Sequence, residues 1–103
     1  MGTDGHTASI FPGPDLETAL EGGKDVRAVG VAPDPLPPEA AVNRVTLTAS
    51  AIGSARTAIL VIHGAEKRAV LEAAIEQGSK SAYPVGRVLD KIAVPVDIYC
   101  LDD

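Results

Sequence analysis

One histidine lies in a loop whose composition could position it for catalysis. His6 belongs to the segment MGTDGHTASIFPG, where glycine, aspartate, threonine and serine favour a loop with a short helical turn. Histidine changes its charge near neutral pH, and its neutral imidazole can take a proton from water. Asp4 is close enough to help orient the loop or the imidazole, and Thr7 and Ser9 could hold the turn or donate to a substrate. By spacing alone, a surface histidine is the commoner interpretation.

Two cations lie where an α/β enzyme usually places its site, at strand ends and the adjoining loops. Arg44 opens the predicted strand RVTLT, and Lys67 follows the strand AILVI in HGAEK. Arginine can make bidentate hydrogen bonds to phosphate oxygens, and lysine offers a compact positive charge. Both residues are therefore candidates for binding a phosphate or for stabilising negative charge that develops during a reaction. A surface salt bridge is the alternative for Arg44. The alternative for Lys67 is a solvated helix residue, although a helix N-terminus does not favour a cation.

The remaining reactive side chains predict no metal site and no cofactor. His6 and His63 are far apart in the sequence, and one cysteine, Cys100, adds no ligand spacing. Cys100 lies in the apolar run VDIYCL, which favours a buried structural thiol and fits a reducing compartment. His63 is interpreted as structural or peripheral, and Gly64 as a residue that shapes the backbone before a helix. Arg56 and Arg68 are expected to be solvated.

Composition narrows the class of protein. The chain has 103 residues, enough for one domain, and its 46% hydrophobic content includes only 3% aromatics. A core of small aliphatic side chains suits parallel strands covered by helices. Fourteen acidic and nine basic residues give a net charge of -5, which disfavours nucleic-acid binding but allows a local site for one phosphate. No apolar run is long enough to cross a membrane, so the expected location is the cytoplasm.

Hydrophobic patterning then gives the elements that position these residues. The clearest are the strand Ala58–Ile62, expected to be buried on both faces, and the amphipathic helix Ala65–Gln77, ended by Gly78. Ser79–Arg87 is expected to form a loop, and Val88–Ile92 is left unassigned. The other expected elements are a helix at Asp15–Leu20 ended by Gly22 and Gly23, strands at Arg27–Ala32, Arg44–Thr48 and Pro95–Leu101, an exposed connector at Pro33–Pro38, and a helical turn at Ala49–Ser54.

The order of strands and helices predicts an α/β fold with a doubly wound, parallel-type, Rossmann-like sheet and flanking helices. One convincing long helix is too little to cover both faces of the central strand. The domain is therefore expected to be incomplete. Either more sequence precedes it or a second copy supplies the cover, through homo-oligomer formation.

The full N-terminal sequence indicates function more specifically than the spacing of His6 and its polar neighbours does. GTDGHTASIFPG resembles the G-x-DGHTAS-x-FPG motif of the 6-phosphogluconolactonases, which share their fold with the sugar-phosphate isomerases and deaminases. Arg44 in NRVTLT, Gly64 and Lys67 in HGAEK, and the terminal YCLDD extend the similarity over nearly the whole chain. The resemblance implies an enzyme of the pentose phosphate pathway that hydrolyses 6-phosphogluconolactone. It also implies that His6 is the general base with Asp4 beside it. The residues implied to contact substrate or phosphate are Gly5, Thr7, Arg44 and Lys67.

Two alternatives to the lactonase remain. The related glucosamine-6-phosphate deaminases continue their DGH as I-A-F-N-E-P, whereas His6 is followed here by TASIFPG, which favours the lactonase. Lactonases of this type are about twice as long as this chain, within the range of one α/β domain. Residues 1–103 are therefore expected to be the C-terminal portion of such a domain, with weak or no activity alone, because convergent groups act together. The other alternative is a non-catalytic, self-associating module.

Overall fold

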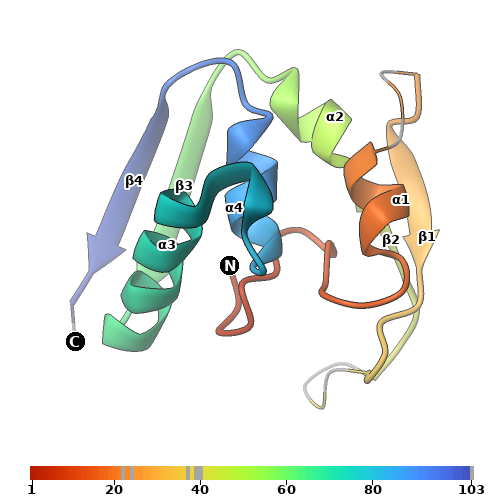
Figure 1. The fold of residues 1–103 in the computed structure, drawn as a ribbon, viewed down its shortest axis with the longest axis horizontal. Helices are drawn as coiled ribbons and strands as arrows, with labels where there is room; N and C mark the ends of the chain where they lie inside the picture. The colour runs from red at the N-terminus through yellow and green to blue at the C-terminus, as the bar shows by residue number, and fades with distance from the viewer. Residues whose placement is uncertain (22, 24, 37, 39–40, 103) are drawn as a thin grey trace.

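The chain folds into a succession of short helices and strands (Figure 1). This computed structural model describes residues 1–21, 23, 25–36, 38 and 41–102. Gly22, Pro37 and Asp103, which sequence analysis assigned to a helix end, the connector and the terminal motif, lie outside the described residues. In order, the elements are α1 (Leu16–Glu21), β1 (Ala28–Val31), β2 (Arg44–Leu47), α2 (Ala49–Gly53), β3 (Ala58–His63), α3 (Ala65–Gln77), the 3-10 turn η1 (Gly78–Lys80), α4 (Pro84–Asp90) and β4 (Val96–Leu101).

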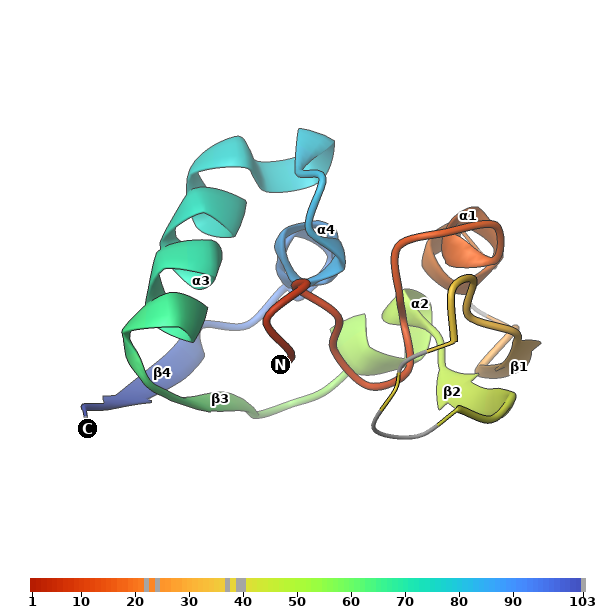
Figure 2. The ribbon, with the colours of Figure 1, turned by 90° about the horizontal axis from the view of Figure 1, so that it is seen from below.

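The C-terminal half is a parallel strand–helix–strand unit. β3 and β4 pair in parallel, with Ala58 beside Val96 and His63 beside Leu101, and α3, η1 and α4 form the connection between them. Figure 2 shows α3 and α4 on the same side of these strands. Gly64, at φ 95°, provides the turn from β3 into α3. The predicted α/β class and the parallel pairing are confirmed.

The N-terminal half departs from the expected doubly wound sheet. β1 and β2 pair antiparallel with each other, so the described strands form two separate two-stranded sheets. Thr46 of β2 and Thr48, directly after the strand, are buried, while Val45 and Leu47 are exposed. Thr48 caps α2 by accepting a hydrogen bond from the Ala51 N–H, and its hydroxyl donates to the Val26 carbonyl. The sequence correctly placed the strand, but its apolar side faces solvent.

The loop predicted for Ser79–Arg87 is wrong, because this range contains most of η1 and most of α4. Pro84 begins α4 at a position where its missing N–H costs nothing. The rest of the helix includes glycine, aspartate and two valines, which have low intrinsic helix propensity, and this hid it in the sequence. Tertiary packing stabilises it: Val85 and Val88 are both buried.

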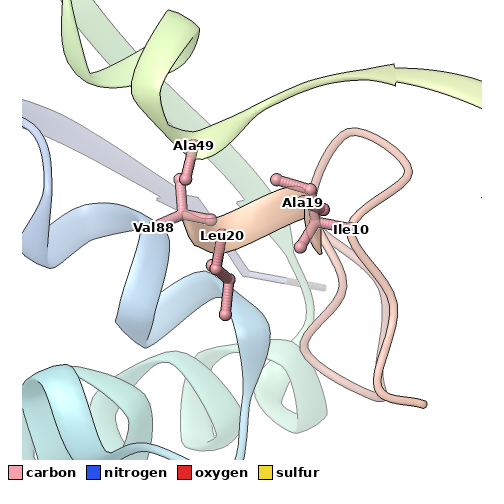
Figure 3. Close-up of a cluster of buried hydrophobic side chains, with 5 residues drawn as sticks. All are labelled: Ile10, Ala19, Leu20, Ala49 and Val88. Carbon is pink, nitrogen blue, oxygen red and sulfur yellow. The ribbon is translucent and has the colours of Figure 1, made fainter. Parts of the chain in front are cut away.

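Helix α4 joins the two halves through the hydrophobic core. Val88 packs with residues of the first cluster, Ile10, Ala19, Leu20 and Ala49 (Figure 3). Val85, one turn earlier, packs in a second cluster with Ile62, Leu71 and Ala74. At the surface, Arg87 of α4 forms two hydrogen bonds with the Glu17 carboxylate of α1, at 3.0 and 3.3 Å. One short helix therefore fixes the N-terminal segment against the parallel unit.

The other face of the β3–β4 sheet is not covered by the described residues. Alternate residues of the two strands lie on this side, and we define the bare sheet face by its exposed apolar members, Ile59 and Val61 of β3 and Tyr99 and Leu101 of β4. The prediction that Ala58–Ile62 is buried on both faces is therefore wrong for this chain. Cys100 is also exposed, which corrects the expected buried thiol. Both errors have one cause, since interior-type strands appear here without a second covering layer.

Candidate active site

The loop that carries His6 is held by its own backbone. The Gly2 N–H donates to the His6 carbonyl at 2.9 Å, and the Gly5 N–H donates to the Gly2 carbonyl at 3.0 Å. Gly5 has φ 82°, and an added Cβ would collide with Tyr83. Its carbonyl accepts a hydrogen bond from the Val85 N–H at 2.8 Å. The first turn of α4 thus fixes this loop, and only glycine fits at position 5.

Asp4 is bonded to His6 twice. Its Oδ1 accepts from the His6 backbone N–H at 3.0 Å and lies 2.5 Å from the imidazole Nδ1. A carboxylate can only accept, so the Nδ1 proton is directed at Asp4 and Nε2 of the neutral ring retains its lone pair. Partial burial raises the pKa of Asp4, but these hydrogen bonds and the nearby imidazole outweigh it, and the pKa lies below its ordinary value. The pair has the arrangement of a base held by a carboxylate.

The chain after His6 makes a tight turn rather than the expected helical one. Thr7 and Ile10 form an isolated β-bridge, with Ala8 at φ 51° between them. Ile10 is fully buried in the first core cluster, and the Ser9 N–H donates to Thr46 Oγ1 of β2 at 3.0 Å. These contacts attach the segment to β2, the strand that carries Arg44.

Phe11 lies between the functional groups of these two segments. The His6 imidazole stacks on the Phe11 ring with centroids 4.3 Å apart. The guanidinium carbon of Arg44 lies over the same ring, 4.7 Å from its centroid. Sequence analysis did not select Phe11 as a site residue. Its signal was available, because it is the only phenylalanine in the chain and lies five residues after His6.

His6, Asp4, Arg44 and Lys67 all line one open pocket of about 980 Å³. The four come from the N-terminal segment, from the start of β2 and from the first turn of α3. The pocket is completed by Met1, Gly2, Thr3, Phe11, Pro12, Gly13, Asp34, Pro35, Leu36 and Pro38. Two cations therefore face the same space as the histidine–carboxylate pair. The part of the proline-rich connector that is described, which sequence analysis treated only as an exposed link, forms one wall.

The other predicted site residues lie outside the pocket lining. Gly5 is buried against Tyr83, and Thr7 belongs to the β-bridge. Their direct contact with substrate remains a prediction; what the structure gives them is a part in shaping the loop. His63 is exposed at the end of β3 and does not line the pocket. Arg68 is exposed and paired with Glu72 on α3, at 3.1 Å.

The described residues give no indication of a metal centre. Within them, no three side chains among histidine, cysteine, aspartate and glutamate gather closely enough to hold an ion. The same part of the chain contains no helix with the length and apolar character needed to cross a membrane.

Fold and pocket together define an α/β protein with a histidine–carboxylate pair facing a cationic pocket. The family model described as glucosamine-6-phosphate isomerases/6-phosphogluconolactonase matches residues 1–95, and the chain belongs to this family. It is 40% identical to the 6-phosphogluconolactonase of Neisseria meningitidis over 100 residues, which are 96% of this chain and 41% of that protein.

Solved structures give the same result. A 6-phosphogluconolactonase from Shewanella baltica matches with a TM-score of 0.84 and 35% identity, over 100% of this chain and 42% of that one. The 6-phosphogluconolactonase from Trypanosoma brucei matches with a TM-score of 0.75 and 35% identity, over 99% of this chain and 37% of that one. The chain thus spans about two-fifths of the length of these relatives.

Proposed function

We propose that this chain carries the base and part of the phosphate site of an enzyme that hydrolyses 6-phosphogluconolactone to 6-phosphogluconate. One observation carries the proposal: the His6–Asp4 pair faces the same pocket as Arg44 and Lys67. Membership of a family whose similar relatives are named 6-phosphogluconolactonases supports it. The reaction belongs to the pentose phosphate pathway and requires no cofactor, and we expect the enzyme in the cytoplasm.

Opening the lactone requires a nucleophile and a proton for the leaving group. In the proposed mechanism, Nε2 of His6 removes a proton from water as the water oxygen attacks the lactone carbonyl carbon. The tetrahedral intermediate then collapses with cleavage of the bond between that carbon and the ring oxygen. The imidazolium returns the proton to this oxygen, giving the hydroxyl of the open-chain acid. Asp4 holds the ring and stabilises the transient positive charge, as its hydrogen bond to Nδ1 supports.

Arg44 and Lys67 are proposed to bind the phosphate. Both are half-buried and line the pocket. Their two positive charges would attract the dianionic phosphate of a small substrate. The phosphate would hold the lactone carbonyl within reach of His6, converting a bimolecular reaction into a positioned one. A deaminase-like sugar-phosphate isomerase would use the same phosphate site. The sequence after His6, TASIFPG instead of I-A-F-N-E-P, favours the lactonase.

We further propose that residues 1–103 are the C-terminal portion of a longer α/β domain. The bare sheet face supports this, because its four exposed apolar side chains belong to strands of interior character. The chain also spans only about two-fifths of its relatives. In the longer domain the remaining sequence would cover that face. For this chain alone, we expect self-association through the same face and weak activity.

The experiment compares two histidine variants. Loss of 6-phosphogluconolactone is followed by NMR above the spontaneous rate, for this chain and for a form extended at its N-terminus to the length of its relatives. His6→Ala should remove about 10²- to 10⁴-fold of the enzymatic rate, the usual contribution of a positioned base. His63→Ala is the matched control and should retain the rate, since His63 lies outside the pocket lining.

The two forms separate the parts of the proposal. Activity only in the extended form, lost with His6→Ala, would support the lactonase assignment with an incomplete site in residues 1–103. Activity in both forms would make these residues sufficient. If the extended form is inactive, or if His6→Ala hydrolyses the lactone as fast as His63→Ala, the assignment of His6 as the base is wrong.

A further inference from the structure

Phe11 contacts two residues with different proposed roles. One is His6, the proposed general base, and the other is Arg44, a proposed phosphate ligand. Its ring stacks with the His6 imidazole at 4.3 Å and an interplanar angle of 29°, and it lies 4.7 Å from the Arg44 guanidinium carbon. Because both distances are measured to the same ring centre, the imidazole centre and the guanidinium carbon are no more than about 9 Å apart. The two groups are thus held within about the length of one phosphorylated sugar.

The Phe11 ring is itself firmly placed. Phe11 is only 9% exposed, although it borders an open pocket. Its neighbour Ile10 is fully buried in the first core cluster, and Pro12 restricts the backbone on the other side. The Ser9–Thr46 hydrogen bond attaches the same segment to β2. The ring therefore gives both polar groups a fixed surface.

We propose that Phe11 is a positioning residue that sets the His6 imidazole and the Arg44 guanidinium relative to each other. Ring stacking restricts rotation of the imidazole, and the cation–π contact selects one arrangement of the long arginine side chain. Asp4 directs the proton on His6 Nδ1, whereas the Phe11 ring contacts both His6 and Arg44. The proposal rests on the proposed function, because it requires that both groups serve one substrate.

A positioning role has consequences that a purely packing role lacks. If the ring only filled space, its replacement would lower the amount of folded protein and leave the folded fraction with normal binding. If it positions Arg44 and His6, the folded variant should bind the anion more weakly and also react more slowly. KM and kcat should therefore change together in Phe11→Leu, whereas loss of packing elsewhere should change neither.

The first test measures the chain without relying on its activity. In Phe11→Leu, NMR should show loss of the ring-current shifts on the His6 ring protons and on the Arg44 side chain. Titration with 6-phosphogluconate, the product of the proposed reaction, should show binding about 3- to 10-fold weaker than in the unsubstituted chain, the range of a partly exposed cation–π contact. Phe11→Tyr retains the ring and should restore both readouts.

The matched control is Val88→Ala, a loss of buried volume in the core cluster that contains Ile10. It should lower stability and leave the affinity of the folded protein unchanged. If Phe11→Leu does not fold, Phe11→Met, which is similar in volume but has no ring, takes its place. Equal affinity in Phe11→Leu, Val88→Ala and the unsubstituted chain would overturn the proposal, as would failure of the unsubstituted chain to bind 6-phosphogluconate.

The kinetic test uses whichever form hydrolyses the lactone. Phe11→Leu should raise KM and lower kcat by about 3- to 10-fold each, with recovery in Phe11→Tyr. The proposed function fails if His6→Ala leaves the rate unchanged. The positioning role alone fails if His6→Ala abolishes the rate while Phe11→Leu keeps both constants at the values of Val88→Ala.

Discussion

The N-terminal segment, residues 1–13, has little regular secondary structure but many fixed contacts. The β3–β4 sheet has regular secondary structure but one exposed apolar face. The segment has only one isolated β-bridge, yet Ile10 is fully buried and Asp4, Gly5 and Ser9 all take part in hydrogen bonds with defined partners. The sheet is regular over six residue pairs, yet Ile59 and Val61 are more than half exposed.

This difference shows that a segment can be held in place by tertiary contacts without having regular secondary structure. The segment is fixed by contacts with α4 and β2, so it can position His6 although its backbone is irregular. The sheet obtains its order from backbone pairing and leaves one apolar face without cover in the described residues. The proposed chemistry depends on the irregular region, whereas the proposal that these residues belong to a longer domain rests on the exposed face of the regular one.

The largest expected effect comes from making one substitution in both regions. Ile10→Ala should lower the free energy of unfolding by about 3 kcal/mol, because it opens a cavity in the first core cluster. At protein concentrations low enough to keep the chain monomeric, Ile59→Ala should lower it by less than about 1 kcal/mol, because that side chain is 60% exposed in the monomer. Urea denaturation of the two variants in parallel measures the difference.

Equal costs at the two positions would contradict the comparison for the monomer. They would mean that Ile59 is buried in solution, in which case gel filtration should show a species larger than one chain. Val61→Lys on the same face would then shift that species toward the monomer, since a lysine is costly in an apolar interface.

A second, smaller effect concerns the glycine that shapes the His6 loop. Gly5→Ala should cost about 2–3 kcal/mol, because φ is positive and the added Cβ would meet the Tyr83 side chain. Gly30→Ala in β1 is the matched control and should be near neutral, since its Cβ would meet only the Arg44 carbonyl, at 3.9 Å. Thermal denaturation followed by circular dichroism compares them. Equal melting temperatures would show that the loop adapts and is not fixed by α4.

The smallest expected effect is the pH dependence contributed by Asp4. Its pKa is lowered in the folded state, so the folded chain binds the proton less readily than the unfolded chain. The stability that Asp4 contributes is therefore present above the ordinary aspartate pKa and is lost as pH falls through the folded-state pKa. Asp4→Asn should be less stable than the unsubstituted chain at pH 7, and the difference should shrink below about pH 4.

This is tested by measuring the denaturation midpoints of both proteins between about pH 2.5 and pH 7. That range covers the titration of one carboxyl group. Because all other acidic groups are common to both proteins, the difference isolates Asp4. A difference that does not vary with pH would show that Asp4 acts through its shape and not its charge, and would weaken its assignment as the partner that holds His6.

Much of the local structure could be predicted from the sequence. The predicted helix at Ala65–Gln77 has the bounds of α3, and the predicted strands at Arg27–Ala32, Arg44–Thr48, Ala58–Ile62 and Pro95–Leu101 each match an observed strand within one residue at either end. These segments have strong periodicity or bounding glycines and prolines, which act locally. Helix α4 was missed, because its residues favour a helix only when packed between the two core clusters.

The sequence by itself determined most of the element types, the family resemblance carried by GTDGHTASIFPG and the choice of His6, Asp4, Arg44 and Lys67 as candidates. Only the tertiary structure decided that these four line one pocket, that Phe11 contacts two of them, and that β1 and β2 pair antiparallel. It also decided which apolar faces stay exposed. The physical reason is range: turn chemistry and periodicity act over a few residues, whereas a shared pocket and a covered face depend on segments that meet only when the chain folds.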